Sequence, residues 1–122
     1  MNVLLGIAGS DESDDALRET VDRAVEAGDD LTAAILEGAD HDRSADDLES
    51  QAREMIDDAG LDATIRRVSG DPGSELVEIA EREGFDRLVI GGGQRSPMGK
   101  IQLGSITEFV LLNAQVSVTL VR

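Results

Sequence analysis

The sequence predicts a single α/β domain built on a five-stranded parallel sheet with helices on both faces. Five short apolar segments alternate with four segments in which apolar residues recur at helical spacing, and this alternation is typical of parallel sheets. Most of the short segments are apolar almost throughout, as expected of strands buried on both faces. A length of 122 residues corresponds to one domain, and no linker or internal repeat divides residues 1–122.

The expected strands are short runs bounded by residues that interrupt a sheet. They are residues 2–8, 31–36, 62–68, 86–90 and 116–121. The run 62–68 alternates between apolar and polar side chains, which indicates a strand with one exposed face, at an edge of the sheet. The run 86–90 leads into the glycines from Gly91 to Gly93, and a loop of about a dozen residues then reaches Gly104.

Each expected helix has an apolar stripe and a residue suited to begin or end it. The helices are residues 11–28, 44–60, 72–84 and 105–114. The stripe of the first helix is Ala16, Leu17, Thr20, Val21, Ala24 and Val25. The stripe of the second helix is Leu48, Ala52, Met55, Ile56 and Ala59. Ser10 or Ser13 is suited to cap the first helix, Ser44 precedes the second, and Pro72 lies at the start of the third.

The composition excludes several kinds of chemistry. The chain has no Cys and a single His, His41, so it cannot form a disulfide framework, a thiol nucleophile or a Cys/His zinc site. His41 lies between two aspartates in a polar loop, and we interpret it as a solvated residue rather than a ligand or a catalyst. The absence of cysteine is compatible with the reducing cytoplasm, where we expect the protein to act, and no run is long and apolar enough for a membrane helix.

The excess of acidic residues disfavours some kinds of binding partner. The formal net charge is −15, which disfavours binding to nucleic acid and docking on an anionic membrane. Ten of the eleven cations are Arg, whereas adaptation to heat favours Lys together with Glu. At ~1 M salt the Debye length is only ~3 Å, so a cytoplasm rich in salt would screen this self-repulsion. We therefore expect a halophilic source, with an ordinary acidic protein as the alternative.

The predicted topology indicates where a ligand would bind. In doubly wound sheets, ligands bind beyond the carboxyl ends of the strands, at the point where the strand order reverses. For five strands we expect the order 3-2-1-4-5, so the reversal lies between the first and the fourth strand. The two loops that flank this point are residues 8–10 and the glycine-rich residues 91–104.

The charge distribution favours an anion at this point. Residues 1–90 hold 25 acidic and 8 basic residues, whereas residues 91–122 hold one acid and three cations. Backbone N–H groups of a glycine-rich loop, with the N-terminus of the helix that begins near Ser105, can hold a phosphate. Arg95 and Lys100 could add positive charge. The alternative interpretation is that the glycines only form tight turns.

The glycine-rich loop does not fit the Walker A pattern. Five residues rather than four separate Gly93 from Gly99, and Ile101 stands where Ser or Thr would hold Mg²⁺. Instead, the segment LVIGGGQRSPMGKIQLGSITEFVLLNAQVSVTLVR resembles the C-terminal signature of the universal stress protein family, whose ATP-binding members carry G-x2-G-x9-G-[S/T]. The runs VLLGIAGSDESDDALRETVDRA and SGDPGSELVEIAEREGFDRLVIG are similar to earlier parts of the same family. The resemblance covers almost the whole chain.

The resemblance implies a Rossmann-like fold, a homodimer and an adenine nucleotide in the predicted crevice. The nucleotide would be ATP or AMP, with Mg²⁺ bound only together with it. The family dimer often forms through the last strand, here Val116 to Val121. The sequence predicts that this strand is apolar on both faces and lies at an edge of the sheet in the expected order. Such an edge favours pairing with another chain.

The resemblance also assigns candidate site residues, to which we add the cations of the loop. They are Gly91, Gly93, Gln94, Arg95, Lys100, Gly104, Ser105, Ala8 and Leu36. Gly91 matches the first glycine of the motif, and Gly104 with Ser105 matches its closing pair. Gln94 occupies the place of the second glycine, and Ala8 the place where many members have an Asp. Leu36 matches the region that contacts adenine.

Three functions remain open at this point. The first is a nucleotide-binding stress protein, in which bound phosphate organises the loop and biases a dimer or partner surface. The second is a family member that binds no nucleotide and acts through protein contacts, and the departures at Gln94 and Ala8 favour it. The third is an enzyme such as a slow ATPase, which is the weakest because no residue resembles a general base placed beside a phosphate.

The expected adaptation to salt leads to the first prediction. Screening by concentrated salt should stabilise a chain with a net charge of −15, so the protein should unfold at a higher temperature in ~3 M than in ~0.05 M KCl. Thermal unfolding followed by far-UV circular dichroism measures this difference. Equal stability in the two solutions would contradict a halophilic adaptation and favour an ordinary acidic protein.

Overall fold

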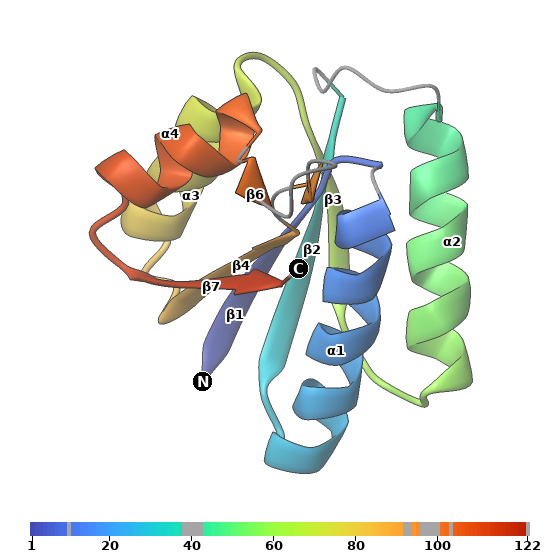
Figure 1. The fold of residues 1–122 in the computed structure, drawn as a ribbon. Coiled ribbons are helices and arrows are strands. Elements are labelled where there is room, and N and C mark those ends of the chain that lie inside the picture. Colours follow the sequence, from blue (N-terminus) through green and yellow to red (C-terminus); the bar gives the residue numbers. More distant parts are fainter. Residues whose placement is uncertain (10, 38–42, 92–93, 96–100, 103, 122) are drawn as a thin grey trace.

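The computed structural model describes residues 1–9, 11–37, 43–91, 94–95, 101–102 and 104–121, and Figure 1 shows its fold. The main sheet contains β1 (Asn2–Ile7), β2 (Asp30–Leu36), β3 (Thr64–Val68), β4 (Arg87–Gly91) and β7 (Ser117–Val121). The helices are α1 (Asp11–Ala27), α2 (Ala45–Asp58), α3 (Pro72–Arg82) and α4 (Ser105–Asn113). All nine expected elements are present, within a few residues of their expected bounds.

The order of the main sheet is β3-β2-β1-β4-β7, and all of its strand pairs are parallel. In chain order this is 3-2-1-4-5, so the predicted fold class is confirmed. β1 lies at the centre, where Leu4 pairs with Thr32 of β2 and with Leu88 of β4. The strand order therefore reverses between β1 and β4, as the sequence predicts.

The helices cover the two faces of the sheet in pairs. Figure 1 shows α1 and α2 on one face, and α3 and α4 on the other. Successive residues of β1 point to opposite faces, so Val3 and Leu5 join the core under α1 and α2, whereas Leu4 joins the core under α3 and α4. The two cores hold the sheet between them and leave the ends of the strands open to loops.

α3 approaches the sheet closely at Gly6. A Cβ atom at this position would lie 2.8 Å from Cδ1 of Leu76 on α3, so a larger residue would require the side chain of Leu76 to shift. A glycine in the middle of a buried strand often marks such an approach. α3 therefore sits directly on β1, and the carboxyl end of β1 is fixed between two layers of helices.

The structure departs from the sequence-based prediction in two respects. The segment after β4 contains β5 (Gln94–Arg95) and β6 (Ile101–Gln102), which pair antiparallel, where the sequence predicts only a loop. Strands of two residues are too short to show a period, so no pattern indicates them. The predicted apolar stripes also extend too far, since Val25 is 51% exposed and Ala59 is exposed. Both residues lie at the ends of their helices.

The two edge strands differ in how they are covered. On β3, Arg66 binds Glu83, and the pKa of Arg67 is raised by hydrogen bonds to Asp46 and then to Glu49. The expectation that β7 is apolar on both faces is wrong for the face toward α1. There Thr119 points to α1 with Val121, and Ser117 is exposed, while Val118 and Leu120 pack toward α3 and α4.

None of the helices in the described part of the chain is long and apolar enough to cross a membrane.

Candidate functional site

The candidate site lies where the carboxyl ends of β1 and β4 meet. β1 ends at Ile7 and continues into Ala8 and Gly9, while β4 ends at Gly91. The register pairs Gly6 with Ile90 just before these ends, so the two loops leave the sheet side by side. Because α1 and α4 follow these loops on opposite faces, the chain diverges here and leaves room for a ligand.

The N-terminus of α4 lies beside the end of β4. Gly104 is the N-cap residue of α4, and among the described residues no side chain forms a cap hydrogen bond there. The hydroxyl of the buried Thr107 donates a hydrogen bond of 3.3 Å to the backbone carbonyl of Gly91. This bond ties the first turn of α4 to β4, and it brings together Gly91, Gly104 and Ser105, three of the predicted site residues.

Gly104 and Ser105 expose the positive end of α4. Both residues are exposed, and no described heavy atom lies within 4 Å of the place where a Cβ of Gly104 would be. The first N–H groups of a helix have no partner within the helix, and they carry a partial positive charge. An anion could therefore approach the backbone of Gly104 closely and accept hydrogen bonds from α4.

The structure describes less of the remaining predicted residues of the loop. Gly93 and Lys100 lie outside the described residues. The backbone of Gln94 pairs with Gln102 and that of Arg95 with Ile101, in the β5–β6 pair.

Leu36 lies at the carboxyl end of β2. Its side chain is buried in the core under α3 and α4, with an exposed fraction of 1%. The side chain therefore points away from solvent, and only the backbone of Leu36 lies at the edge of the sheet where a base could reach it.

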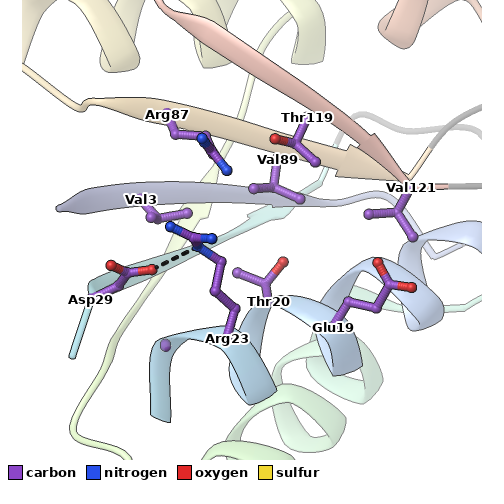
Figure 2. Close-up of a pocket in the computed structure, with 10 residues that line it drawn as sticks. Val3, Glu19, Thr20, Arg23, Asp29, Arg87, Val89, Thr119 and Val121 are labelled. Carbon is purple, nitrogen blue, oxygen red and sulfur yellow. Dashed lines mark hydrogen bonds and ion pairs between the residues drawn. The ribbon is translucent and has the colours of Figure 1, made fainter. Parts of the chain in front are cut away.

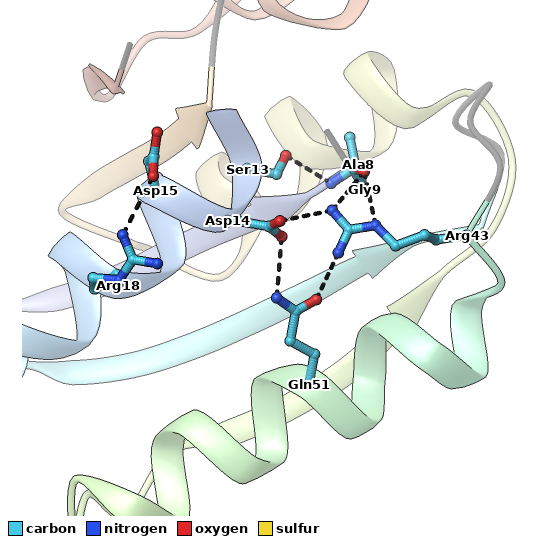
Figure 3. Close-up of polar contacts among 8 residues, drawn as sticks. All are labelled: Ala8, Gly9, Ser13, Asp14, Asp15, Arg18, Arg43 and Gln51. Carbon is cyan, nitrogen blue, oxygen red and sulfur yellow. Dashed lines mark hydrogen bonds and ion pairs between the residues drawn. The ribbon is translucent and has the colours of Figure 1, made fainter. Parts of the chain in front are cut away.

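A polar cluster that the sequence does not predict surrounds the loop after β1 (Figure 3). Arg43 donates hydrogen bonds from Nε and Nη2 to the backbone carbonyl of Gly9, at 3.1 and 2.8 Å. Its Nη2 also binds Asp14 Oδ2 at 2.8 Å, and its Nη1 binds Gln51 Oε1 at 2.8 Å. Gln51 Nε2 completes the ring by donating to Asp14 Oδ1 at 3.3 Å. The cluster joins the β1–α1 loop to α1 and α2.

Ser13 fixes the same loop from the side of α1. The sequence suggests Ser10 or Ser13 as the cap of α1. Ser10 lies outside the described residues. The hydroxyl of Ser13 accepts a hydrogen bond of 3.1 Å from the backbone N–H of Ala8. Ser13 is 1% exposed, so this bond is shielded from water. Gly9 has a φ of 92°, which a residue with a side chain rarely adopts. The backbone of Ala8 and Gly9 is thus held by the protein itself.

No group of three or more His, Asp or Glu side chains in the described part of the chain is arranged to hold a metal ion. His41 lies outside the described residues. What the described geometry offers is the exposed N-terminus of a helix, positioned beside the end of a strand, which is suited to binding rather than to proton transfer.

A model of the Universal stress protein family matches residues 1–122. The chain belongs to this family. Among curated relatives, a universal stress protein of Methanocaldococcus jannaschii is 31% identical over 72 residues, which are 59% of this chain and 42% of that protein. The match therefore spans less than half of the relative's length.

Solved universal stress proteins share the whole fold of this chain. One from Archaeoglobus fulgidus has a TM-score of 0.82 at 23% identity, covering 100% of this chain and 98% of that one. Another, solved in complex with cAMP, has a TM-score of 0.77 at 26% identity, covering 100% and 97%. Further members of the family are solved with dAMP, from Archaeoglobus fulgidus, and with AMP, from Arabidopsis thaliana. The Rossmann-like α/β fold is thus shown.

The polar cluster provides the second prediction. Replacing Arg43 by Ala leaves the carboxylate of Asp14 and the carbonyl of Gly9 without this donor, so it should lower the free energy of unfolding by about 1–3 kcal/mol. Urea unfolding measures the change. The matched control is Arg18→Ala, since Arg18 is more exposed and binds Asp15 on the same helix; this change should cost less than about 1 kcal/mol. Equal effects of the two changes would show that the cluster does not hold the loop.

Proposed function

We propose that this universal stress protein binds an adenine nucleotide, AMP or ATP, in the crevice beyond β1 and β4, and that it acts as a non-enzymatic regulator in the cytoplasm. The observation that carries the proposal is the exposed N-terminus of α4 at Gly104, tied to the end of β4 through Thr107 and Gly91. Members of the same family and fold are solved with cAMP, dAMP and AMP, which supports an adenine nucleotide as the ligand.

The phosphate is the part of the nucleotide that the chain is best suited to hold. The N-terminus of α4 provides N–H groups that no side chain among the described residues caps, and Gly104 and Ser105 match the closing pair of the family's nucleotide motif. The same segment contains Arg95 and Lys100, two of the three cations after residue 90, where the rest of the chain is strongly acidic. Bound phosphate would order this loop, with Mg²⁺ present only together with the nucleotide.

A second function is favoured by two departures from the family pattern, one on each side of the crevice. Ala8 lacks the carboxylate that many members place there, and its N–H already binds Ser13. Gln94 occupies the place of a motif glycine. A member that binds no nucleotide and acts through protein contacts would have this combination. The two functions differ in whether AMP or ATP binds at all, so calorimetry separates them.

The third prediction concerns Gly104. The wild-type protein should bind AMP and ATP in calorimetric titrations, with micromolar affinity, at a KCl concentration at which it is folded. Gly104→Leu should abolish this binding, because its side chain would occupy the place of the phosphate, while the unfolding temperature stays near that of the wild type since no described atom crowds the position. A matched control is Gly104→Ala, whose small methyl group should weaken binding less. Undiminished affinity in Gly104→Leu would contradict the site.

A gain of affinity tests the same site without damaging it. Gln94→Gly restores the family motif and should strengthen AMP binding. Gln102→Gly is the matched control, because it removes an identical side chain from the opposite strand of the β5–β6 pair. If neither the wild type nor Gln94→Gly binds nucleotide, the protein acts by contacts alone. Release of phosphate from bound ATP would instead indicate the slow ATPase.

We further propose that the protein is a homodimer joined through its last strand, the segment from Val116 to Val121. β7 lies at an edge of the main sheet, where its outer backbone groups have no neighbouring strand among the described residues. Leu111 and Leu112, on the helix that precedes β7, are 42% and 77% exposed, an apolar surface that a partner could cover.

The fourth prediction follows from this edge. Static light scattering should give twice the mass of one chain, and Ser117→Lys, at an exposed position of β7, should reduce it toward the monomer mass because a lysine on an edge strand opposes pairing. Arg82→Lys on the exposed face of α3 serves as the control and should leave the mass unchanged. A monomer mass for the wild type would rule out the dimer.

A further inference from the structure

A second pocket lies on the face of the sheet that carries α1, away from the crevice (Figure 2). It has a volume of about 270 Å³ and is bounded by α1, by β1, β4 and β7, and by Asp29. The pocket forms because β7 is the edge strand of the sheet, whereas α1 lies mainly over the inner strands β1 and β4. The volume is slightly below the ~300–1,000 Å³ of sites for drug-sized ligands, which restricts an occupant to a small molecule.

The interior of the pocket is apolar, while its ends carry charge. Val3, Val89 and Val121 line it from three strands of the sheet. Figure 2 shows Arg23 and Arg87 directed toward the end that is bounded by Val3 and Asp29, and Glu19 at the opposite end. An elongated molecule with an apolar body and one charged end would match this arrangement.

Arg87 is the unusual charge of the pocket. It is half-buried, and it has no acidic partner among the described residues of a chain with 26 acids. The other arginines whose side chains are described each have one: Arg18 with Asp15, Arg23 with Asp29, Arg43 with Asp14, Arg53 with Glu49, Arg66 with Glu83, Arg67 with Asp46 and Arg82 with Glu78. A cation kept free of acids beside a pocket is suited to binding an anion from solution.

The charges that face Arg87 across the pocket define the polarity of the site. Arg23 Nε and the N-terminal ammonium of Met1 each bind the carboxylate of Asp29 at 3.2 Å, so two cations offset this negative charge. Glu19, at the far end, makes no ion pair with the described residues. One end of the pocket therefore attracts a negative group, and the other end repels one.

Thr20 adds a second observation that points to a ligand. It lines the pocket from α1, is only 6% exposed, and its hydroxyl makes no hydrogen bond with any described residue. Buried hydroxyl groups are usually paired, because leaving one unpaired costs free energy. A polar atom of a bound molecule would provide the missing partner.

We propose that this pocket binds a small aliphatic monocarboxylate. Its carboxylate would lie on the guanidinium of Arg87, accept a hydrogen bond from it, and reach the hydroxyl of Thr20, while its hydrocarbon chain lies along Val3 and Val89 toward Val121. Glu19 at the far end excludes a second carboxylate. The site is separate from the proposed nucleotide crevice, which lies beyond the carboxyl ends of the strands.

The test uses hexanoate as the probe, by calorimetry and thermal unfolding, at the lowest KCl concentration that keeps the protein folded. Hexanoate should bind and raise the unfolding temperature, whereas neutral hexanamide, which keeps the hydrocarbon chain but has no charge, should bind at least tenfold more weakly. Adipate, which has the same length and two carboxylates, should bind more weakly than hexanoate. Glu19→Gln should reduce that difference.

Two variants locate the binding. Arg87→Gln should weaken the binding of hexanoate at least tenfold, because it removes a charged hydrogen-bond donor. Thr20→Val keeps the shape of the side chain. It should weaken the binding of hexanoate without lowering the unfolding temperature of the free protein. Arg82→Gln, on the opposite face of the sheet, is the matched control and should bind like the wild type. AMP binding should be unaffected by Arg87→Gln, which keeps this test independent of the nucleotide proposal.

Two outcomes would overturn the assignment. One is the absence of hexanoate binding to the wild-type protein at millimolar concentrations. The other is binding that Arg87→Gln and Arg82→Gln weaken equally, since that would show a general effect of charge rather than a pocket.

Discussion

The parallel pairing of β1 with both β2 and β4 is the constraint on which the rest of the structure depends. Once β1 is central, the chain must first move outward through β2 to β3 and then return to the other side of β1 for β4 and β7. Right-handed crossovers place helices on one face for the first direction and on the opposite face for the second. The loops after β1 and β4 therefore diverge, and the resulting crevice is a consequence of topology rather than of any particular side chain.

The fold was predictable because buried parallel strands and amphipathic helices have strong local patterns. The strand β1 and the stripe of α1 are examples, and the register of the sheet follows from them. The β5–β6 pair and the role of Arg43 were not predictable, for different reasons. Two-residue strands have no period, and Arg43 contacts Gly9 and Gln51, whose proximity exists only after the sheet has formed. At the site, Gly104 and Ser105 could be found from a motif, whereas Thr107 could not, because its bond to Gly91 depends on tertiary packing.

The excess of acids gives the few cations distinct roles. Most described arginines bind carboxylates, and at the surface such pairs contribute little to stability. Arg43 differs because it also binds the carbonyl of Gly9, so it organises a loop rather than merely balancing a charge. Arg87 differs in the opposite way, since it faces a pocket without an acidic partner among the described residues. In a chain of net charge −15, an arginine beside a pocket that pairs with none of the described acids is more informative than it would be in a neutral protein.

The two walls of the crevice are not equivalent. This difference indicates which of the two departures from the family sequence, at Ala8 or at Gln94, should affect nucleotide binding more. On the β1 wall, the N–H of Ala8 binds Ser13 and the carbonyl of Gly9 binds Arg43, so these backbone groups are already engaged. On the α4 wall, no side chain among the described residues caps the N-terminal N–H groups beside Gly104. Recognition of a nucleotide would then depend mainly on its phosphate and on the segment between β4 and α4. Gln94 lies in that segment and Ala8 does not, so the glycine missing at position 94 should affect binding more than the aspartate missing at position 8.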